Sequence, residues 1–259
     1  MSDQAFQLDN VSLAIDGKVL LHPLDLGFRK GRITGLLGHN GSGKSTLLKL
    51  LARQMRPSGG RVLFDGAPLD RLADRAFARR VAFMPQQPPD TDELTVRELV
   101  ALGRYPWHGA LGRFTDHDRK TVDRALSRTG LEDFSSRVVR TLSGGERQRA
   151  MVAMLIAQDS DFLLLDEPIS ALDIAKQIEV MTLIRDCADQ DGKTVIVVLH
   201  DVNVAARFCD DVVALAGGRL IAREPSGDLM NPEHLEAIYG IPMGIFKHPD
   251  TQAPISYVV

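Results

Sequence analysis

The sequence predicts an α/β domain with a mostly parallel sheet and a helical subdomain inserted into it. Two continuous apolar runs, residues 162–165 and 194–199, are bounded by charged or turn residues, which is typical of strands buried on both faces of a parallel sheet. Helical patterns alternate with strand patterns, notably over residues 171–190, and this alternation indicates βαβ units. Between residues 85 and 161 the strand patterns disappear, so we expect the helical insertion there.

The individual elements follow from the periodicity of apolar residues. We expect strands at residues 11–15, 32–37, 61–65, 81–84, 162–165, 194–199, 212–215 and 219–223. A helix is expected directly after residue 46, where Leu47, Leu48 and Leu51 recur on one face. Further helices are expected at residues 171–190 and around residues 232–238, and the latter is expected to finish the chain.

Composition excludes several classes of protein. The chain has 259 residues, 44% of them apolar and 25% charged, which is near the average for soluble globular proteins. A net charge of −3 and a pI near 6.2 argue against non-specific nucleic-acid binding. Cys187 and Cys209 belong to no CxxC pair, so we expect free buried thiols and neither a disulfide nor a zinc site.

Membrane segments are not expected either. The first ten residues lack the basic and apolar stretches of a secretory signal. The longest apolar runs have the length of a strand, whereas a membrane span needs about 18 or more apolar residues in a row. If the protein serves a membrane, we expect it to do so through a partner.

A glycine-rich motif between a predicted strand and a predicted helix indicates a phosphate-binding loop, or P-loop. Glycines let successive backbone N–H groups turn towards phosphate oxygens, and the helix adds its positive N-terminal end. Within GxxxxGK[ST], the lysine reaches the β- and γ-phosphates and the hydroxyl of the next residue ligates Mg²⁺. The motif comprises Gly38, His39, Asn40, Gly41, Ser42, Gly43, Lys44, Ser45 and Thr46; Lys44 and Ser45 are the two residues with these roles.

Two adjacent carboxylates end the apolar strand at residues 162–165. They are Asp166 and Glu167, and their mutual repulsion is costly unless a cation lies beside them. A P-loop protein needs a strand-end carboxylate of this kind to hold Mg²⁺ and its waters. We therefore expect Asp166 to face the metal and Glu167 to act as the general base on the attacking water.

A second glycine-containing helix start decides what kind of P-loop protein this is. Residues 142–148 read LSGGERQ, in which Ser143 and Glu146 form a capping box. The pattern is compatible with a well-capped helix alone. Gly144 and Gly145, however, free the backbone to approach an anion, so we expect a second phosphate-binding helix terminus that serves a nucleotide held by another subunit.

With these motifs in this order, the chain resembles the ABC ATPase family over nearly its whole length. Residues 38–46 resemble the Walker A loop, residues 142–148 the family signature, and residues 162–167 the Walker B strand with its catalytic glutamate. Gln86 resembles the Q-loop glutamine, which the family uses as a further Mg²⁺ ligand. Asp173, in residues 170–173, matches the D-loop, and His200 matches the switch histidine that orients the γ-phosphate and the attacking water.

The resemblance implies one nucleotide-binding domain over residues 1–259. It has a P-loop NTPase core (residues 1–86 and 160–259) with a small antiparallel β part near the N-terminus, and a helical signature subdomain (residues 87–159). Two copies would pair head to tail around two Mg-ATP, each held between one Walker A loop and the other copy's signature. Closure on ATP would drive a separate integral membrane permease, at the cytoplasmic face of a bacterial inner membrane, with a periplasmic or lipoprotein substrate-binding protein acting indirectly.

Three positions depart from the family pattern. His39 stands where the family usually has proline, and Ile169 where it usually has threonine. Both changes look tolerable. Ile15 stands where relatives commonly stack an aromatic ring on adenine, so base recognition is expected to be weak.

Several stretches resemble the ATPases of importers of iron–siderophore complexes, haem and vitamin B12, with the strongest likeness to ferric hydroxamate (ferrichrome) importers. They are residues 95–100, 103–109, 113–114 and 238–242, and the likeness to ferric hydroxamate importers rests on residues 103–114 together with 146–160. Within them, Tyr105 and Trp107 are expected to face the permease, and Phe114 to lie either there or in the core. Haem, vitamin B12 or ferric citrate remain alternative cargoes. A soluble ABC ATPase and a non-hydrolysing regulatory module are alternative functions.

Overall fold

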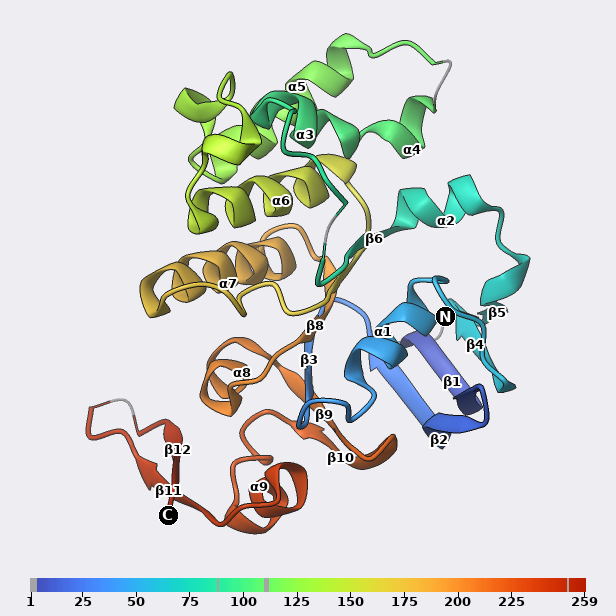
Figure 1. Cartoon of the computed structure of the whole chain (residues 1–259), viewed down its shortest axis with the longest axis vertical. Helices are drawn as coiled ribbons and strands as arrows, with labels where there is room; N and C mark the ends of the chain where they lie inside the picture. Colours follow the sequence, from blue (N-terminus) through green and yellow to red (C-terminus); the bar gives the residue numbers. More distant parts are fainter. Residues whose placement is uncertain (1–3, 88, 110–111, 251) are drawn as a thin grey trace. The chain divides into compact units, whose positions relative to one another are not determined.

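The computed structural model describes residues 4–87, 89–109, 112–250 and 252–259 (Figure 1). These residues form two compact units: the first unit comprises residues 1–71 and 194–259, and the second unit comprises residues 72–193. Among the described residues, no helix combines the length and the apolar character needed to cross a membrane.

The first unit begins with an antiparallel sheet in the strand order β2-β1-β4-β5. The sheet consists of β1 (Gln4–Ile15), β2 (Lys18–Arg29), β4 (Gly59–Phe64) and β5 (Ala67–Pro68), followed by the 3-10 turn η1 (Leu69–Arg71). Asp16 and Gly17, both with positive φ, make the tight turn from β1 to β2. The rings of Phe6 and Phe64 pack across β1 and β4, with centroids 4.8 Å apart.

The parallel strands of the first unit surround β3 (Ile33–Leu37), which pairs in parallel with β8 (Thr194–Val198) on one side and β9 (Asp211–Ala216) on the other. Every residue of β3 and β8 is buried, as expected of strands covered on both faces. β10 (Arg219–Pro225) runs antiparallel to β9. The helices α1 (Lys44–Leu51) and α8 (Val202–Phe208) follow β3 and β8 directly.

The first unit ends with a helix and a hairpin. The helix α9 (Pro232–Tyr239) lies where the sequence predicts it. The expectation that this helix finishes the chain is wrong, because β11 (Met243–Lys247) and β12 (Pro254–Val258) form an antiparallel pair after it. Both strands are short and half-exposed, so neither shows the continuous apolar run that marks the buried strands.

The second unit contains one parallel strand pair and most of the helices. Its elements are α2 (Asp74–Arg80), β6 (Val81–Met84), α3 (Val96–Leu102), α4 (Tyr105–His108), α5 (Asp116–Arg128), η2 (Glu132–Phe134), η3 (Val139–Thr141), α6 (Gly144–Gln158), β7 (Phe162–Leu165) and α7 (Ile174–Asp189). β6 and β7 pair in parallel. α3 and α5 pack against α6, and α6 packs against α7 (Figure 1).

Three helices of the second unit begin with a capping box. In each, a side-chain hydroxyl accepts from a backbone N–H three residues later, and the carboxylate at that position accepts from the cap residue's N–H. Because two otherwise unpaired donors are satisfied at once, these starts are fixed locally by sequence. The pairs are Thr95 with Glu98, Thr115 with Asp118, and Ser143 with Glu146.

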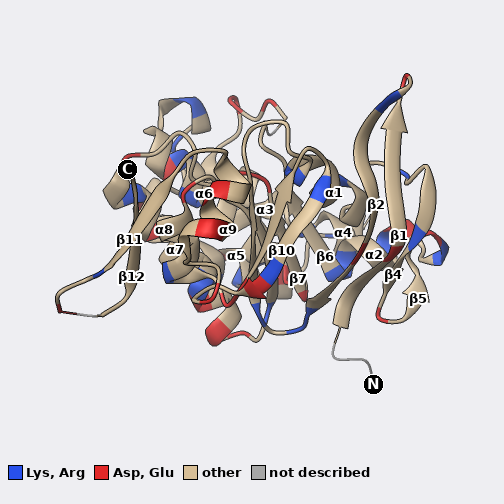
Figure 2. Ribbon diagram, turned by 90° about the horizontal axis from the view of Figure 1, so that it is seen from below, with Lys and Arg blue, Asp and Glu red and all other residues tan. Residues whose placement is uncertain are grey.

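The predicted fold class is confirmed: the chain is a mixed α/β protein with mostly parallel strands, an antiparallel β part near the N-terminus and a run of helices between β6 and β7. The predicted subdomain boundaries at residues 87 and 159 stay a prediction. Acidic and basic residues are interspersed along the ribbon of both units (Figure 2). Some pair within one exposed helix turn, such as Arg185 with Asp189, which adds a few tenths of a kcal/mol, on the order of 0.3–0.5.

Candidate nucleotide site

The glycine-rich loop of residues 38–46 connects β3 to α1 in the first unit. Gly38, Gly41 and Gly43 all have positive φ, at 144°, 77° and 103°. A Cβ atom at Gly38 would lie 2.1 Å from the backbone oxygen of Leu215 and 2.6 Å from Ser42 Oγ. Only glycine therefore fits at Gly38, and the loop backbone closes around a small concavity, as a phosphate cradle requires.

The polar groups of this loop fit an anionic ligand. The Lys44 side chain is buried, and its Nζ donates to the backbone oxygens of Gly38 at 2.8 Å and His39 at 3.0 Å. Ser42 Oγ is buried without a hydrogen-bond partner among the described residues, a costly state that a phosphate oxygen would relieve. The first turn of α1, all of which is described, carries no acidic residue, so its positive N-terminal end stays available to an anion.

In the second unit, two carboxylates follow β7 as predicted. Asp166 is buried, and its backbone N–H donates to the Met84 oxygen at the end of β6. Glu167 adopts a left-handed backbone conformation with φ 54°, which is uncommon for a residue other than glycine and costs on the order of 1 kcal/mol. Gln86 Nε2 donates to Glu167 Oε2 at 2.8 Å. The structure thus brings two predicted site residues into direct contact.

The predicted signature begins α6 in the same unit. Ser143 N and Oγ both donate to Glu146 Oε2, at 2.7 and 2.8 Å. These two hydrogen bonds lower the pKa of Glu146, and the bond from the backbone has the larger effect. A Cβ atom at Gly144 would meet no atom within 4 Å, whereas one at Gly145 would lie 2.9 Å from Lys176 Cδ. The Gly144 face of the helix start is therefore open, and the Gly145 face is packed.

One cavity of about 410 Å³ joins these two regions of the second unit. Its lining includes Gln86, Asp166 and Glu167 from the strand ends and Gly144 and Gln148 from α6. The strand-end carboxylates and the helix start at Gly144 therefore line one common space within the second unit.

The remaining predicted site residues lie at element ends. Asp173 caps α7, because its Oδ1 accepts from the Lys176 N–H at 2.9 Å. His200 is exposed directly after β8, and its backbone oxygen accepts from the Tyr239 hydroxyl at 3.2 Å. Ile15 ends β1 with 41% of its surface exposed. Its aliphatic side chain is thus available to a ligand.

Trp107 is half-buried, and its expected permease-facing role stays a prediction. Its indole Nε1 donates to the Gln158 oxygen at 2.6 Å, and its ring stacks on Arg79 and Arg104. Tyr105 is 55% exposed and can still face a partner. Phe114 is half-buried, with its ring against His108. Ala110 and Leu111 of the same stretch lie outside the described residues.

Two structural features were missed by sequence reasoning. Arg104 is 2% exposed and forms a buried ion pair with Asp118, at 2.8 Å. In the sequence, the only sign of this ion pair is the Thr115–Asp118 capping box, and it does not indicate that an arginine pairs with Asp118. The contact between Tyr239 and His200 joins residues that are far apart in the sequence, so no local pattern predicts it.

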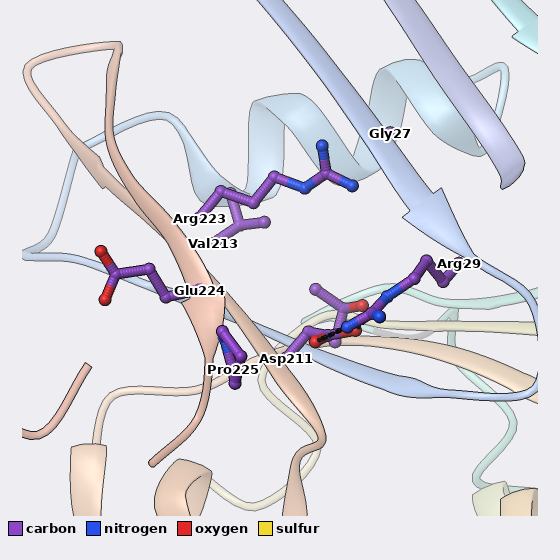
Figure 3. Close-up of a pocket in the computed structure, with 8 residues that line it drawn as sticks. Gly27, Arg29, Asp211, Val213, Arg223, Glu224 and Pro225 are labelled. Atoms are coloured by element: carbon purple, nitrogen blue, oxygen red, sulfur yellow. Dashed lines mark hydrogen bonds and ion pairs between the residues drawn. The ribbon is translucent and has the colours of Figure 1, made fainter. Parts of the chain in front are cut away.

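A separate cavity of about 180 Å³ lies in the first unit, beside β2, β9 and β10 (Figure 3). Asp211 forms ion pairs there with Arg29 and, at 3.0 Å, with Arg32. Arg223 and Glu224 also line the cavity. Asp211 already has two cationic partners, one on β2 and one in the turn before β3. We therefore interpret this cluster as a structural contact that holds the sheet of β2 to the sheet of β9.

Comparisons with known proteins agree with this geometry. A sequence profile of the ABC transporter family matches residues 21–170. The iron(3+)-hydroxamate import ATP-binding protein FhuC of Bacillus subtilis is 37% identical over 95% of this chain and 92% of its own length. The achromobactin transport ATP-binding protein CbrD of Dickeya dadantii is 38% identical over 95% and 91%. The cobalamin import ATP-binding protein BtuD of Halobacterium salinarum is 38% identical over 95% of this chain but only 62% of its own.

Solved structures give the same result. A metal-chelate type ABC transporter in an inward-facing conformation matches 100% of this chain and 97% of its own, with a TM-score of 0.86 and 27% identity. A dimeric ATP-binding cassette in a post-hydrolysis state, bound to ADP and Pi, matches 85% of this chain and 98% of its own, with a TM-score of 0.73 and 29% identity. This chain belongs to the ABC transporter family, as one of its ATP-binding ATPase domains.

Proposed function

We propose that this chain is the ATP-hydrolysing subunit of a bacterial importer that takes up iron–siderophore complexes of the hydroxamate type through a separate membrane permease. The observation that carries the proposal is the agreement among the similar relatives. Four of them are named for hydroxamate, achromobactin, siderophore or petrobactin transport, at 36–38% identity over at least 95% of this chain.

We propose that the glycine-rich loop binds the triphosphate of ATP. The loop comprises Gly38, His39, Asn40, Gly41, Ser42, Gly43, Lys44, Ser45 and Thr46. Lys44 supplies a positive charge to the β- and γ-phosphates, and the Ser42 hydroxyl gains the partner that it lacks among the described residues. Such a site suits the cradle formed by the three positive-φ glycines.

We also propose that Mg²⁺ binds together with the nucleotide. Ser45, Gln86 and Asp166 are the proposed ligands, all of them oxygen donors of the kind that Mg²⁺ prefers. When bound, Mg²⁺ neutralises charge on the β- and γ-phosphates. Asp166 is buried at the end of β7, where a carboxylate is stabilised by a nearby cation.

We propose Glu167 as the general base, Gln86 as its positioning partner and His200 as the residue that orients the γ-phosphate and the attacking water. The 2.8 Å bond from Gln86 Nε2 to Glu167 Oε2 orients the carboxylate, which as general base accepts a proton from the attacking water. The reaction then transfers that proton from the water to Glu167 as the water oxygen bonds to the γ-phosphorus and ADP leaves.

A second copy of the chain is the proposed partner for the signature. Ser143, Gly144 and Gly145 would hold the γ-phosphate of the nucleotide in the other copy, and Asp173 would lie at the same interface. The open face of Gly144 supports this assignment, because a phosphate can approach the helix start there without displacing a side chain. The similar cassette with ADP and Pi is dimeric.

The remaining partners are an integral membrane permease and, indirectly, a periplasmic or lipoprotein substrate-binding protein, with the ATPase at the cytoplasmic face of the inner membrane. The subunit does not touch its cargo. Haem, vitamin B12 and ferric citrate are therefore alternative cargoes, and the cobalamin import relative favours vitamin B12 among them.

The test is uptake in cells that express the chain together with the permease and the binding protein of a ferric hydroxamate importer. We expect uptake of ⁵⁵Fe-ferrichrome that is lost in Lys44→Ala, while labelled cyanocobalamin, haem and ferric citrate are not taken up. Uptake of one of these instead of ferrichrome would correct the cargo. Failure of the chain to co-purify with the permease would contradict the transport function itself.

A further inference from the structure

The C-terminal segment of the chain contacts the residue proposed to orient the γ-phosphate. His200 follows β8 and precedes Asp201, which caps α8 by accepting from the backbone N–H groups of Asn203 and Val204. The hydroxyl of Tyr239, the last residue of α9, donates to the His200 backbone oxygen at 3.2 Å. All of these residues belong to the first unit.

The helix that carries Tyr239 is firmly held. Asn231 caps its start by accepting from the His234 N–H, and Gly240 ends it in the left-handed conformation. Leu235 and Ile238 are completely buried, and α9 packs against β9 and β10. Tyr239 is thus attached to a rigid part of the unit and can restrain the turn after β8.

A second contact restrains the same turn. The side chain of Asn203 donates to the Ser256 oxygen at 3.2 Å and accepts from the Ser256 N–H at 2.8 Å and the hydroxyl at 3.1 Å. Ser256, on β12, is 6% exposed. Burial and the neighbouring Asp201 carboxylate raise the pKa of Tyr239, so its hydroxyl stays protonated and remains a donor.

We propose that Tyr239 is a positioning residue for ATP hydrolysis, and that it acts by fixing the main chain of His200. The proposal rests on the proposed role of His200. A hydrogen bond to the His200 oxygen limits rotation of the peptide unit that leaves this residue, and hence the direction in which its side chain points. Loss of the bond would misplace the imidazole in the transition state without weakening the binding of ATP.

The experiment compares Tyr239→Phe with Tyr257→Phe in steady-state ATP hydrolysis. Tyr257, 48% exposed on β12, gives a matched control that removes the same hydroxyl from the same segment. We expect Tyr239→Phe to lower kcat by about fivefold and to leave KM within about twofold, the pattern for an interaction made in the transition state. Tyr257→Phe should match the wild type in both constants.

A spectroscopic readout separates positioning from general stability. In protein with ¹⁵N-labelled histidine, the imidazole signal of His200, assigned from its loss in His200→Ala, should shift or broaden in Tyr239→Phe and not in Tyr257→Phe. Should Tyr239→Phe fail to fold, Asn203→Ala replaces it, and we expect a fall in kcat of at least about threefold, because three hydrogen bonds to Ser256 are lost.

Three results would overturn the proposal: an unchanged kcat in the folded variant, a rise in KM alone, or an equal loss of kcat in Tyr257→Phe. His200→Ala distinguishes this failure from a failure of the proposed function. If His200→Ala abolishes hydrolysis while Tyr239→Phe behaves as the wild type, only the positioning role of Tyr239 is wrong. If His200→Ala hydrolyses ATP normally, the proposed role of His200 is wrong as well.

Discussion

Loss of one partner of the buried ion pair between Arg104 and Asp118 should strongly destabilise the second unit. Arg104 Nε donates to Asp118 Oδ1, and its Nη1 donates to the Ala157 oxygen, each at 2.8 Å. Asp118 Oδ2 also accepts from Thr115 at the start of α5. Asp118→Ala therefore leaves a buried guanidinium without its counter-ion and removes a helix cap. Breaking a buried pair in this way costs about 3–5 kcal/mol.

The same pair predicts a pH dependence of unfolding. Burial alone would raise the pKa of Asp118, but hydrogen bonds from Thr115 and Arg104 together with the charge of Arg104 lower it from 3.8 to about 2. Because the folded pKa is depressed, the contribution is complete above pH 4 and is lost as the pH falls towards 2. A difference of this size corresponds to about 2 kcal/mol in the free energy of unfolding.

Urea unfolding followed by tryptophan fluorescence measures this directly, since Trp107 is the only tryptophan of the chain and its ring lies over Arg104. Asp116→Ala is the matched control, because Asp116 is an exposed neighbour whose ion pair with Arg119 spans one turn of the helix. It should cost less than about 1 kcal/mol. The reasoning is refuted if Asp118→Ala destabilises no more than Asp116→Ala, or if its acid dependence equals that of the wild type.

Four further substitutions test the site and its surroundings. Gly144→Asp should abolish hydrolysis, while the affinity of the monomer for ATP, measured by calorimetry, stays within about twofold. The reason is that the open position accepts a side chain, whose negative charge then opposes a phosphate. Equal loss of ATP binding and hydrolysis would contradict a composite site. Ile15→Tyr should raise the affinity for ATP several-fold without changing kcat, since base stacking is worth about 1–3 kcal/mol. In the wild type, the affinity for GTP should lie within about tenfold of the affinity for ATP. A strong preference of the wild type for ATP would contradict this. Trp107→Ala should lower the free energy of unfolding by about 2 kcal/mol, whereas Tyr105→Ala should leave stability unchanged and reduce transport. The reverse outcome would show that Trp107, and not Tyr105, faces the partner.

The buried parallel strands were predictable because their environment leaves a strong mark on the sequence. β6 and β7 coincide with the predicted ranges, and β3 and β8 differ by one residue at an end. β2 was missed because its exposed residues interrupt the apolar pattern and Pro23 lies within it. α2 was missed because only Phe77 of its seven residues is buried. Its arginines instead bond to the carbonyl oxygens of Pro106 and Trp107.

The local geometry of the candidate site was predictable where one short motif determines the backbone conformation. The glycines of the loop, the strand-end carboxylates and the capping box at Ser143 all lie where their local patterns indicate. Trp107 and Tyr239 were not predictable in the same way, since their surroundings come from residues about 50 and 40 positions away. Side-chain direction at such positions is decided by tertiary packing, which a single sequence does not encode locally.

The measurement that tests the central claim most directly is ATP binding, hydrolysis and oligomeric state of Glu167→Gln in the presence of Mg²⁺. Removal of the general base should lower the hydrolysis rate by about 10²–10⁴-fold, with ATP still bound and an ATP-dependent dimer visible by light scattering. Glu233→Gln, an exposed position at the start of α9, should match the wild type in rate and remain monomeric. Turnover of Glu167→Gln within a few-fold of the wild type, or the absence of a dimer with ATP bound, would contradict the proposed two-subunit ATPase.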